Sequence, residues 1–140
     1  MYSFGKKSAA NLATTHKLMQ RVARRALELT PYDFAIVHGW RGKDIQNALH
    51  ASGASETPWP GSKHNHTKNG EPCSLAVDFA PWVGNSIPWN ETHVFAVIAG
   101  CFFAAAAELG IDLRWGGDWD GDGNTQEHKL QDWGHIELVI

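Results

Sequence analysis

The chain has 140 residues, 43% of them hydrophobic, and a formal net charge of −3. This length supports one domain with its own core. The slightly acidic balance argues against a nucleic-acid-binding protein, and two cysteines are too few for a disulfide framework. We expect one domain over residues 1–140, acting as a monomer.

The first twenty residues lack the apolar segment of a signal peptide. The most apolar run, Val94–Ala107, is fourteen residues long, and about twenty are needed to span a bilayer. We therefore predict a buried core helix there, no membrane insertion, and a product that starts in the cytoplasm.

In the first half of the chain, apolar residues at helical spacing predict a helix over Ala9–Leu29, ended by Thr30-Pro31. Apolar and β-branched residues predict a strand over Asp33–Trp40, and a short helix follows over Gly42–Ala51. Proline and glycine indicate a loop over Ala54–Gly70.

The second half is predicted to contain a long helix between short strands. The helix is capped by Asn90 and runs to Leu109, with Gly110 just past its end. Strands are predicted over residues 74–80, 111–117 and 134–140, and a polar loop over 118–131. Strands without regular helical crossovers favour an α+β fold with a small, mainly antiparallel sheet flanked by helices.

Polar residues gather around these strands. Arg41 follows the first strand, His64 and His66 precede the second, Asp78 lies within the second, and Asp132 and His135 lead into the last. Two histidines and one aspartate can hold zinc and leave a position for water. A second carboxylate could then act as a general base. The spacing alone leaves open an ordinary domain with scattered histidines, because no H-E-x-x-H helix is present.

Three segments in order resemble a known family. "VHGWRG", "SKH…SLAVDFAPW" and "LRWGGDW" with "DWGHIELV" are similar to the motifs of zinc D-alanyl-D-alanine carboxypeptidases and L-alanyl-D-glutamate peptidases, which share the hedgehog/DD-peptidase fold. The N-terminal half looks most like phage endolysins. The resemblance covers nearly the whole chain.

The resemblance implies a role for each matching residue. Zinc would be held by His64, Asp78 and His135, with Asp132 as the catalytic carboxylate and Arg41 beside the substrate. Gln46 and Ser62 would lie at the substrate. Trp115 and Trp133 flank the proposed site in sequence, and they either pack in the core or shape the substrate groove. His38 lies in the strand before Arg41 and is the one other histidine of interest.

One spacing departs from the family pattern. His64 and Asp78 are fourteen positions apart, whereas the two ligands are about seven apart in the compact family form. The extra residues have loop composition. Ser62 before and Asn65 after favour His64 over His66 as the ligand.

A second motif, "DWDGDGN", resembles the first half of a calcium loop, with Asp118, Asp120 and Asp122 alternating. Lys129 replaces the bidentate glutamate at position twelve, and Glu127 could substitute only from a different geometry. The motif is therefore either a calcium site or a polar turn.

The resemblance implies a phage endolysin that cuts the L-alanyl-D-glutamate bond of bacterial peptidoglycan, staying in the host cytoplasm until it is released to the cell wall. Two alternatives stay open. One is a D-alanyl-D-alanine carboxypeptidase or dipeptidase, and the other is a non-catalytic zinc-containing module that binds the cell wall.

Overall fold

The structure is a computed structural model that describes residues 1–124 and 132–140. Four strands form an antiparallel sheet in the order β1–β4–β6–β5. Their bounds are Phe34–His38 for β1, Ala76–Pro81 for β4, Leu113–Trp115 for β5 and His135–Leu138 for β6. The predicted α+β class with a small antiparallel sheet is confirmed.

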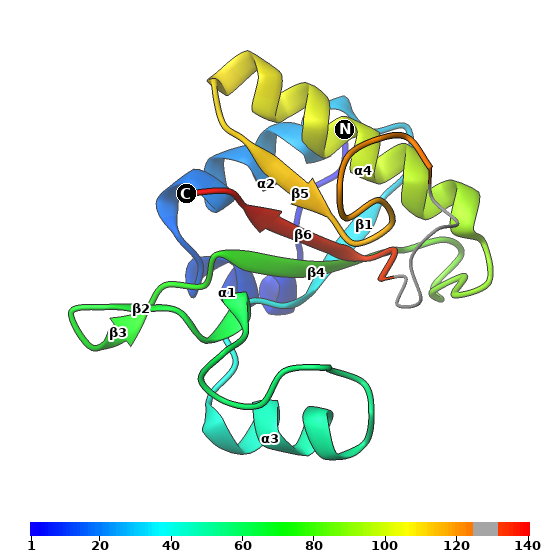
Figure 1. The fold of residues 1–140 in the computed structure, drawn as a ribbon. Helices are drawn as coiled ribbons and strands as arrows, with labels where there is room; N and C mark the ends of the chain where they lie inside the picture. The colour runs from blue at the N-terminus through cyan, green and yellow to red at the C-terminus, as the bar shows by residue number, and fades with distance from the viewer. Residues whose placement is uncertain (125–131) are drawn as a thin grey trace.

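Four α-helices accompany the sheet in the described part of the chain: α1 (Lys6–Ala13), α2 (Lys17–Leu29), α3 (Lys43–Ala51) and α4 (Thr92–Leu109). Figure 1 shows α2 and α4 side by side on one side of β4, while α3 lies on the other side of this strand in the same view. The core therefore lies between the sheet and the α2–α4 pair.

Side-chain alternation along β4 and β6 separates the core from a polar face. Phe79 stacks on Phe102 of α4 with ring centroids 5.3 Å apart, and Ile136 is fully buried. Asp78 and His135 alternate with these residues and pair with each other across the two strands. The same pattern that builds the core therefore presents both polar groups together on the opposite face.

A β-bulge in β1 adds a histidine to this polar face. Ile36 pairs with Phe79, but the next paired residue is His38, opposite Asp78. The register shifts between these two pairs, so one extra residue is accommodated in β1. The bulge thereby turns His38 toward the side of the sheet that carries Asp78.

The predicted helix over residues 9–29 is two helices, α1 and α2, so this prediction was wrong in extent. The break lies at Thr14-Thr15-His16. Ser74 bonds there in both directions, donating to the Thr14 carbonyl at 3.0 Å and accepting from the His16 backbone N–H at 2.9 Å. The His16 ring then caps α2 by accepting from the Leu18 N–H at 3.0 Å. Tertiary contacts with Ser74 thus end the first helix.

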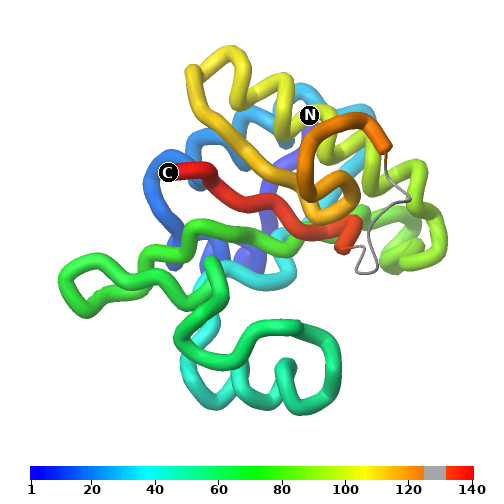
Figure 2. The backbone as a smooth tube through the Cα atoms, in the orientation of Figure 1, coloured from blue at the N-terminus to red at the C-terminus, as the bar shows by residue number. Residues whose placement is uncertain are grey.

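The predicted loop over residues 54–70 also contains more structure than expected. A 3₁₀ turn, η1, covers Lys63–Asn65, and β2 (Thr67–Lys68) pairs with β3 (Glu71–Pro72) in a hairpin. Asn69 and Gly70 at its tip both have positive φ, of 54° and 79°, as a type I′ turn requires. Figure 2 shows this hairpin projecting from the body of the protein.

The long helix agrees with the prediction except at its start. Glu91, rather than Asn90, is the N-cap of α4, and Gly110 ends the helix at a φ of 68°. By length and composition α4 could also cross a membrane. In the structure Phe95, Ile98 and Phe102 are buried against the sheet, as expected for a core helix.

Candidate metal centre and active site

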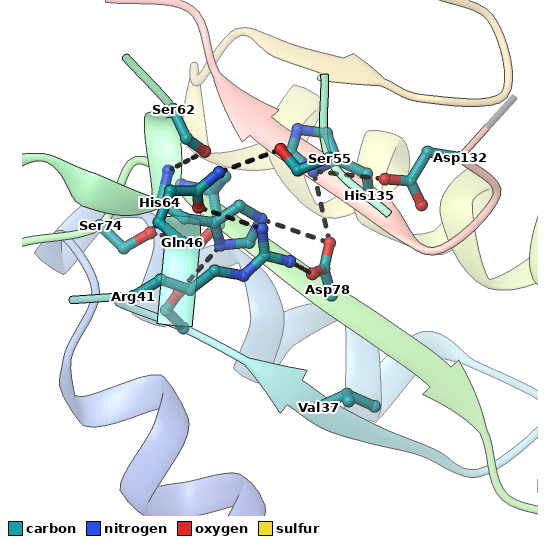
Figure 3. A network of polar contacts seen from close by, with 12 residues as sticks. Val37, Arg41, Gln46, Ser55, Ser62, His64, Ser74, Asp78, Asp132 and His135 are labelled. Atoms are coloured by element: carbon teal, nitrogen blue, oxygen red, sulfur yellow. Dashed lines mark hydrogen bonds and ion pairs between the residues drawn. The ribbon is translucent and has the colours of Figure 1, made fainter. Parts of the chain in front are cut away.

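Three predicted ligands converge on one point. His64 Nε2 and His135 Nδ1 each lie 3.3 Å from the same oxygen, Asp78 Oδ1. One donor atom from each of the three residues falls within 4.8 Å of the others. Figure 3 shows both imidazoles turned toward Asp78, with Asp132 beyond His135.

The outer nitrogens of the two histidines are held in the form that metal binding needs. His64 Nδ1 lies 2.8 Å from the Gly39 carbonyl oxygen, which can only accept, so Nδ1 carries the proton. His135 Nε2 lies 2.9 Å from Glu137 Oε1. The other nitrogen of each ring, His64 Nε2 and His135 Nδ1, faces the cluster, and buried His64 Nε2 has no hydrogen-bond partner among the described residues. This donor set fits a metal ion.

The choice between His64 and His66 follows from the local fold. Ser62 and Asn65 form a reciprocal capping box around η1, and the Arg41 N–H donates to the His64 carbonyl at 2.9 Å. These contacts direct the His64 ring inward. His66 is exposed, and its ring bonds to the Cys73 carbonyl at 2.8 Å. Only His64 reaches the cluster.

The charges of the cluster strongly affect one another's protonation. Although burial acts in the opposite direction, His64 and His135 hold the pKa of Asp78 well below its usual range. Burial lowers the pKa of His135, but hydrogen bonds with Asp78 and Glu137 outweigh this and raise it to about 9. In the absence of metal a proton thus compensates the negative charge that a metal cation would otherwise balance.

Asp132 lies next to the cluster but outside it. Its Oδ2 is 4.0 Å from His135 Nδ1, and its side chain is 45% exposed. The Asp132 N–H donates to the Gly116 carbonyl at 3.0 Å, and any side chain at Gly116 would clash with the Asp132 backbone. Burial and the charge of Asp78 raise the pKa of Asp132. Its position suits a proton acceptor at the edge of the metal centre.

Arg41 and Gln46 support the cluster from the side of α3. An Arg41 amino group pairs with Asp78 Oδ2, the oxygen that does not face the histidines. Gln46 is fully buried and donates to Ser55 Oγ at 3.0 Å and the Thr57 carbonyl at 2.6 Å. This geometry favours a supporting role for Gln46; direct contact with substrate remains a prediction.

A cavity of about 530 Å³ opens over the cluster. Its wall includes Ser62 and Asp132, and also four residues that the sequence analysis did not single out: Lys63, Arg114, Trp119 and Glu137. The Trp119 ring lies 5.3 Å from the His135 ring. A smaller cavity of about 240 Å³ includes Asp78, Asp132 and His38, together with the apolar side chains of Val37, Leu49, Phe79 and Trp89.

The two other tryptophans predicted near the site pack beside it. Trp115 is 8% exposed and belongs to the core. Its Nε1–H donates to the Trp133 carbonyl at 2.8 Å, and the two rings lie 5.6 Å apart. Neither ring is on the wall of the two cavities, so a substrate contact by Trp115 or Trp133 remains a prediction.

The aspartates of "DWDGDGN" form a second group of donors. One oxygen each from Asp118, Asp120 and Asp122 lies within 4.8 Å of the others. Backbone N–H groups of Gly123 and Asn124 donate to Asp118 Oδ2 and Asp122 Oδ1, both at 2.8 Å. Glu127 and Lys129, on which the motif comparison also depended, lie outside the described residues.

Two histidines and one carboxylate converge in an open cavity, and a second carboxylate lies beside them. This arrangement is typical of a mononuclear metallohydrolase. The model of the family described as phage L-alanyl-D-glutamate peptidase matches residues 1–139. The chain belongs to this family.

Two relatives agree with this assignment. The chain is 40% identical over 143 residues to the L-alanyl-D-glutamate peptidase of Escherichia phage T5, covering 99% of this chain and 98% of the relative. The crystal structure of the Serratia marcescens L-Ala D-Glu endopeptidase ChiX superposes with a TM-score of 0.78 at 28% identity. That match covers 98% of this chain and 90% of ChiX. The predicted family and enzyme class are confirmed.

Proposed function

We propose that the protein is a zinc-dependent phage endolysin that hydrolyses the L-alanyl-D-glutamate bond of stem peptides in bacterial peptidoglycan. The observation that supports it most is the convergence of His64 Nε2, Asp78 Oδ1 and His135 Nδ1 beneath an open cavity. Nitrogen and carboxylate donors in this number suit catalytic zinc.

Bound zinc would polarise the scissile carbonyl and lower the pKa of a coordinated water toward about 7. Asp132, beside His135 and partly exposed, would accept the proton of that water and deliver it to the leaving amine. Arg41 would fix the Asp78 carboxylate through its second oxygen and add positive charge where the tetrahedral oxyanion develops.

The bond specificity can be tested by mass spectrometry of purified peptidoglycan digested with the 140-residue chain. The proposal requires new N-terminal D-glutamate on the released fragments. Release of free D-alanine would indicate a carboxypeptidase instead, and intact stem peptides would indicate a module that only binds the wall. Cleavage by this chain alone would also support residues 1–140 as a self-sufficient catalytic domain.

The family acts on the cell wall, so the enzyme must reach it. We propose that the protein accumulates as a monomer in the host cytoplasm until lysis begins, and that its partner is peptidoglycan rather than nucleic acid or membrane. Size-exclusion chromatography with light scattering should give a mass near the 15.4 kDa of one chain.

Glu137 should strengthen metal binding although it is not a ligand. Because it accepts from His135 Nε2–H, its loss would free the ring to reorient. Replacing such an outer partner typically costs about 10–100-fold in metal affinity. We expect Glu137→Leu to weaken zinc by this factor in a chelator competition assay, and Glu137→Gln, which keeps an acceptor, to weaken it less.

Glu56 provides the control for this prediction, because it lines the same cavity and is exposed. Glu56→Leu should leave the zinc dissociation constant unchanged. Equal zinc affinities for Glu137→Leu and the unmodified protein would show that Glu137 does not orient His135.

We further propose that calcium binds weakly at Asp118, Asp120 and Asp122, because a cation would relieve the repulsion of three gathered carboxylates. With few ligands the dissociation constant should fall at roughly 10⁻⁴–10⁻³ M. Calcium added to the zinc-loaded protein should raise activity and release or absorb heat in calorimetry. Asp120→Ala should remove both responses, and absence of heat at millimolar calcium would reduce the motif to a polar turn.

A further inference from the structure

Two cations on the cavity wall have no role in the chemistry described so far. Lys63 directly precedes ligand His64, and Arg114 lies on β5, and both are exposed. No ion pair joins either of them to another described residue. The Arg114 guanidinium lies 5.1 Å above the Trp119 ring, a contact that fixes its direction without neutralising its charge. The cavity thus presents two available positive charges.

The strand register brings Arg114 close to the metal centre. Arg114 pairs with Glu137 across β5 and β6, and His135 pairs with Asp78. Glu137 is two residues from His135, which is about 6.8 Å along a strand, and neighbouring strands lie about 4.8 Å apart. This is within the reach of an arginine side chain. Lys63, Arg114 and Glu137 also line the same cavity.

The proposed substrate carries a matching anion. The scissile bond joins the L-alanyl carbonyl to the D-glutamyl nitrogen, and the stem peptide continues through the γ-carboxyl group. The α-carboxylate is therefore free and only two covalent bonds from the scissile nitrogen. The D-glutamyl nitrogen is the leaving group, so its α-carboxylate must lie close to the metal centre when the bond is cut. The site must then either bind this charge or leave it in water.

The two cavities differ in what they offer this carboxylate. The larger one contains Lys63 and Arg114. The wall of the smaller one is mainly apolar, and Arg41, the one arginine or lysine common to both linings, is already paired with Asp78. A carboxylate placed in the smaller cavity would lose hydration and find only Arg41 among the arginines and lysines of its lining, and Arg41 shares its charge with Asp78, so this placement is costly.

We infer that Lys63 and Arg114 bind the free α-carboxylate of the substrate's D-glutamyl residue, and that the D-glutamyl side of the scissile bond lies in the larger cavity. This inference rests on the proposed function. It makes both residues specificity determinants: the enzyme discriminates between stem peptides that carry D-glutamate and those that carry D-isoglutamine, in which this carboxylate is an amide.

The same two cations could instead serve only to balance the charge of Glu137. In that case their removal would weaken the metal centre and slow all substrates equally. Comparing two substrates removes this common factor. The test therefore uses two synthetic peptides that differ at one residue. One contains L-alanyl-γ-D-glutamyl and the other L-alanyl-γ-D-isoglutaminyl. The ratio of their kcat/KM values is measured for each protein, together with its zinc content.

The unmodified protein should favour the glutamyl peptide by about 10–100-fold, the size expected for hydrogen bonds to a charged group. Arg114→Gln and Lys63→Gln should each reduce this ratio by about threefold or more, and the double variant should bring it near one. Arg24→Gln removes an exposed charge of α2, away from the cavity, and should keep the full ratio.

The possible results distinguish a failure of the proposed function from a failure of this inference alone. If the unmodified protein cleaves neither peptide, the proposed function fails, and this inference with it. If it cleaves both equally, or prefers the isoglutaminyl peptide, only the inference fails. A ratio unchanged in Arg114→Gln or in Lys63→Gln excludes that residue from the carboxylate site, even if zinc content or overall rate has fallen.

Discussion

Replacing His64 with alanine should abolish both metal binding and peptidase activity. His64 supplies one of three converging donor atoms, and its Nε2 is buried. The remaining Asp78 and His135 would leave the metal with too few protein ligands for a stable site. Zinc measured by atomic absorption should fall from about one ion per chain toward zero, and cleavage of peptidoglycan should become undetectable.

His66 is the matched control, since it lies two residues further on and is exposed. Within the described residues, its ring bonds to the Cys73 carbonyl at 2.8 Å and to no other group. His66→Ala should keep zinc near one ion per chain and cleave peptidoglycan at close to the normal rate. The reverse pattern, with zinc lost in His66→Ala and kept in His64→Ala, would reassign the ligand.

Replacing Asp132 with asparagine should leave zinc in place and remove most turnover. The side chain is nearly isosteric, and Asp132 is outside the group of converging donors. Losing a general base typically costs about 10²–10⁴-fold in rate. We expect a fall of this size in kcat, with zinc content near one and unchanged thermal unfolding.

Asp112 offers a comparison for this substitution, because it is an exposed aspartate outside both cavities. Asp112→Asn should have normal kcat. Loss of zinc in Asp132→Asn would show that Asp132 is a ligand or holds one in place. A near-normal kcat would remove it from the proton transfer.

Local patterns predicted the parts of the fold that are set by local forces. Alternation predicted the strand that contains β4, and Gly110 marked the end of α4. Burial on one face and a left-handed cap are both visible in the local sequence. The division of α1 from α2 left no such trace. It depends on Ser74 bonding to Thr14 and His16 across sixty or so intervening residues.

The grouping of His64, Asp78 and His135 agrees with the motifs, whereas the residues around this group were not predicted. Glu137 could have been found, because alternation places it on the same face as His135 two residues earlier. Arg114 required the β5–β6 register, which a three-residue strand does not specify. Asp118, Asp120 and Asp122 do gather as the calcium motif suggests, and whether an ion binds there is a matter for the calorimetric test.

The β2–β3 hairpin bears on how relatives of this enzyme are sought in genomes. Its base is closed by backbone bonds from Cys73 to His66 and from Leu75 to Lys63, both at 3.0 Å. The hairpin between His66 and Cys73 can therefore be longer or shorter in a relative while the backbone at His64 and Asp78 keeps its position. A pattern search that fixes the gap between these two residues would pass over such chains. One that scores Ser62-x-His64 and Ala76-x-Asp78 as separate blocks would retain them.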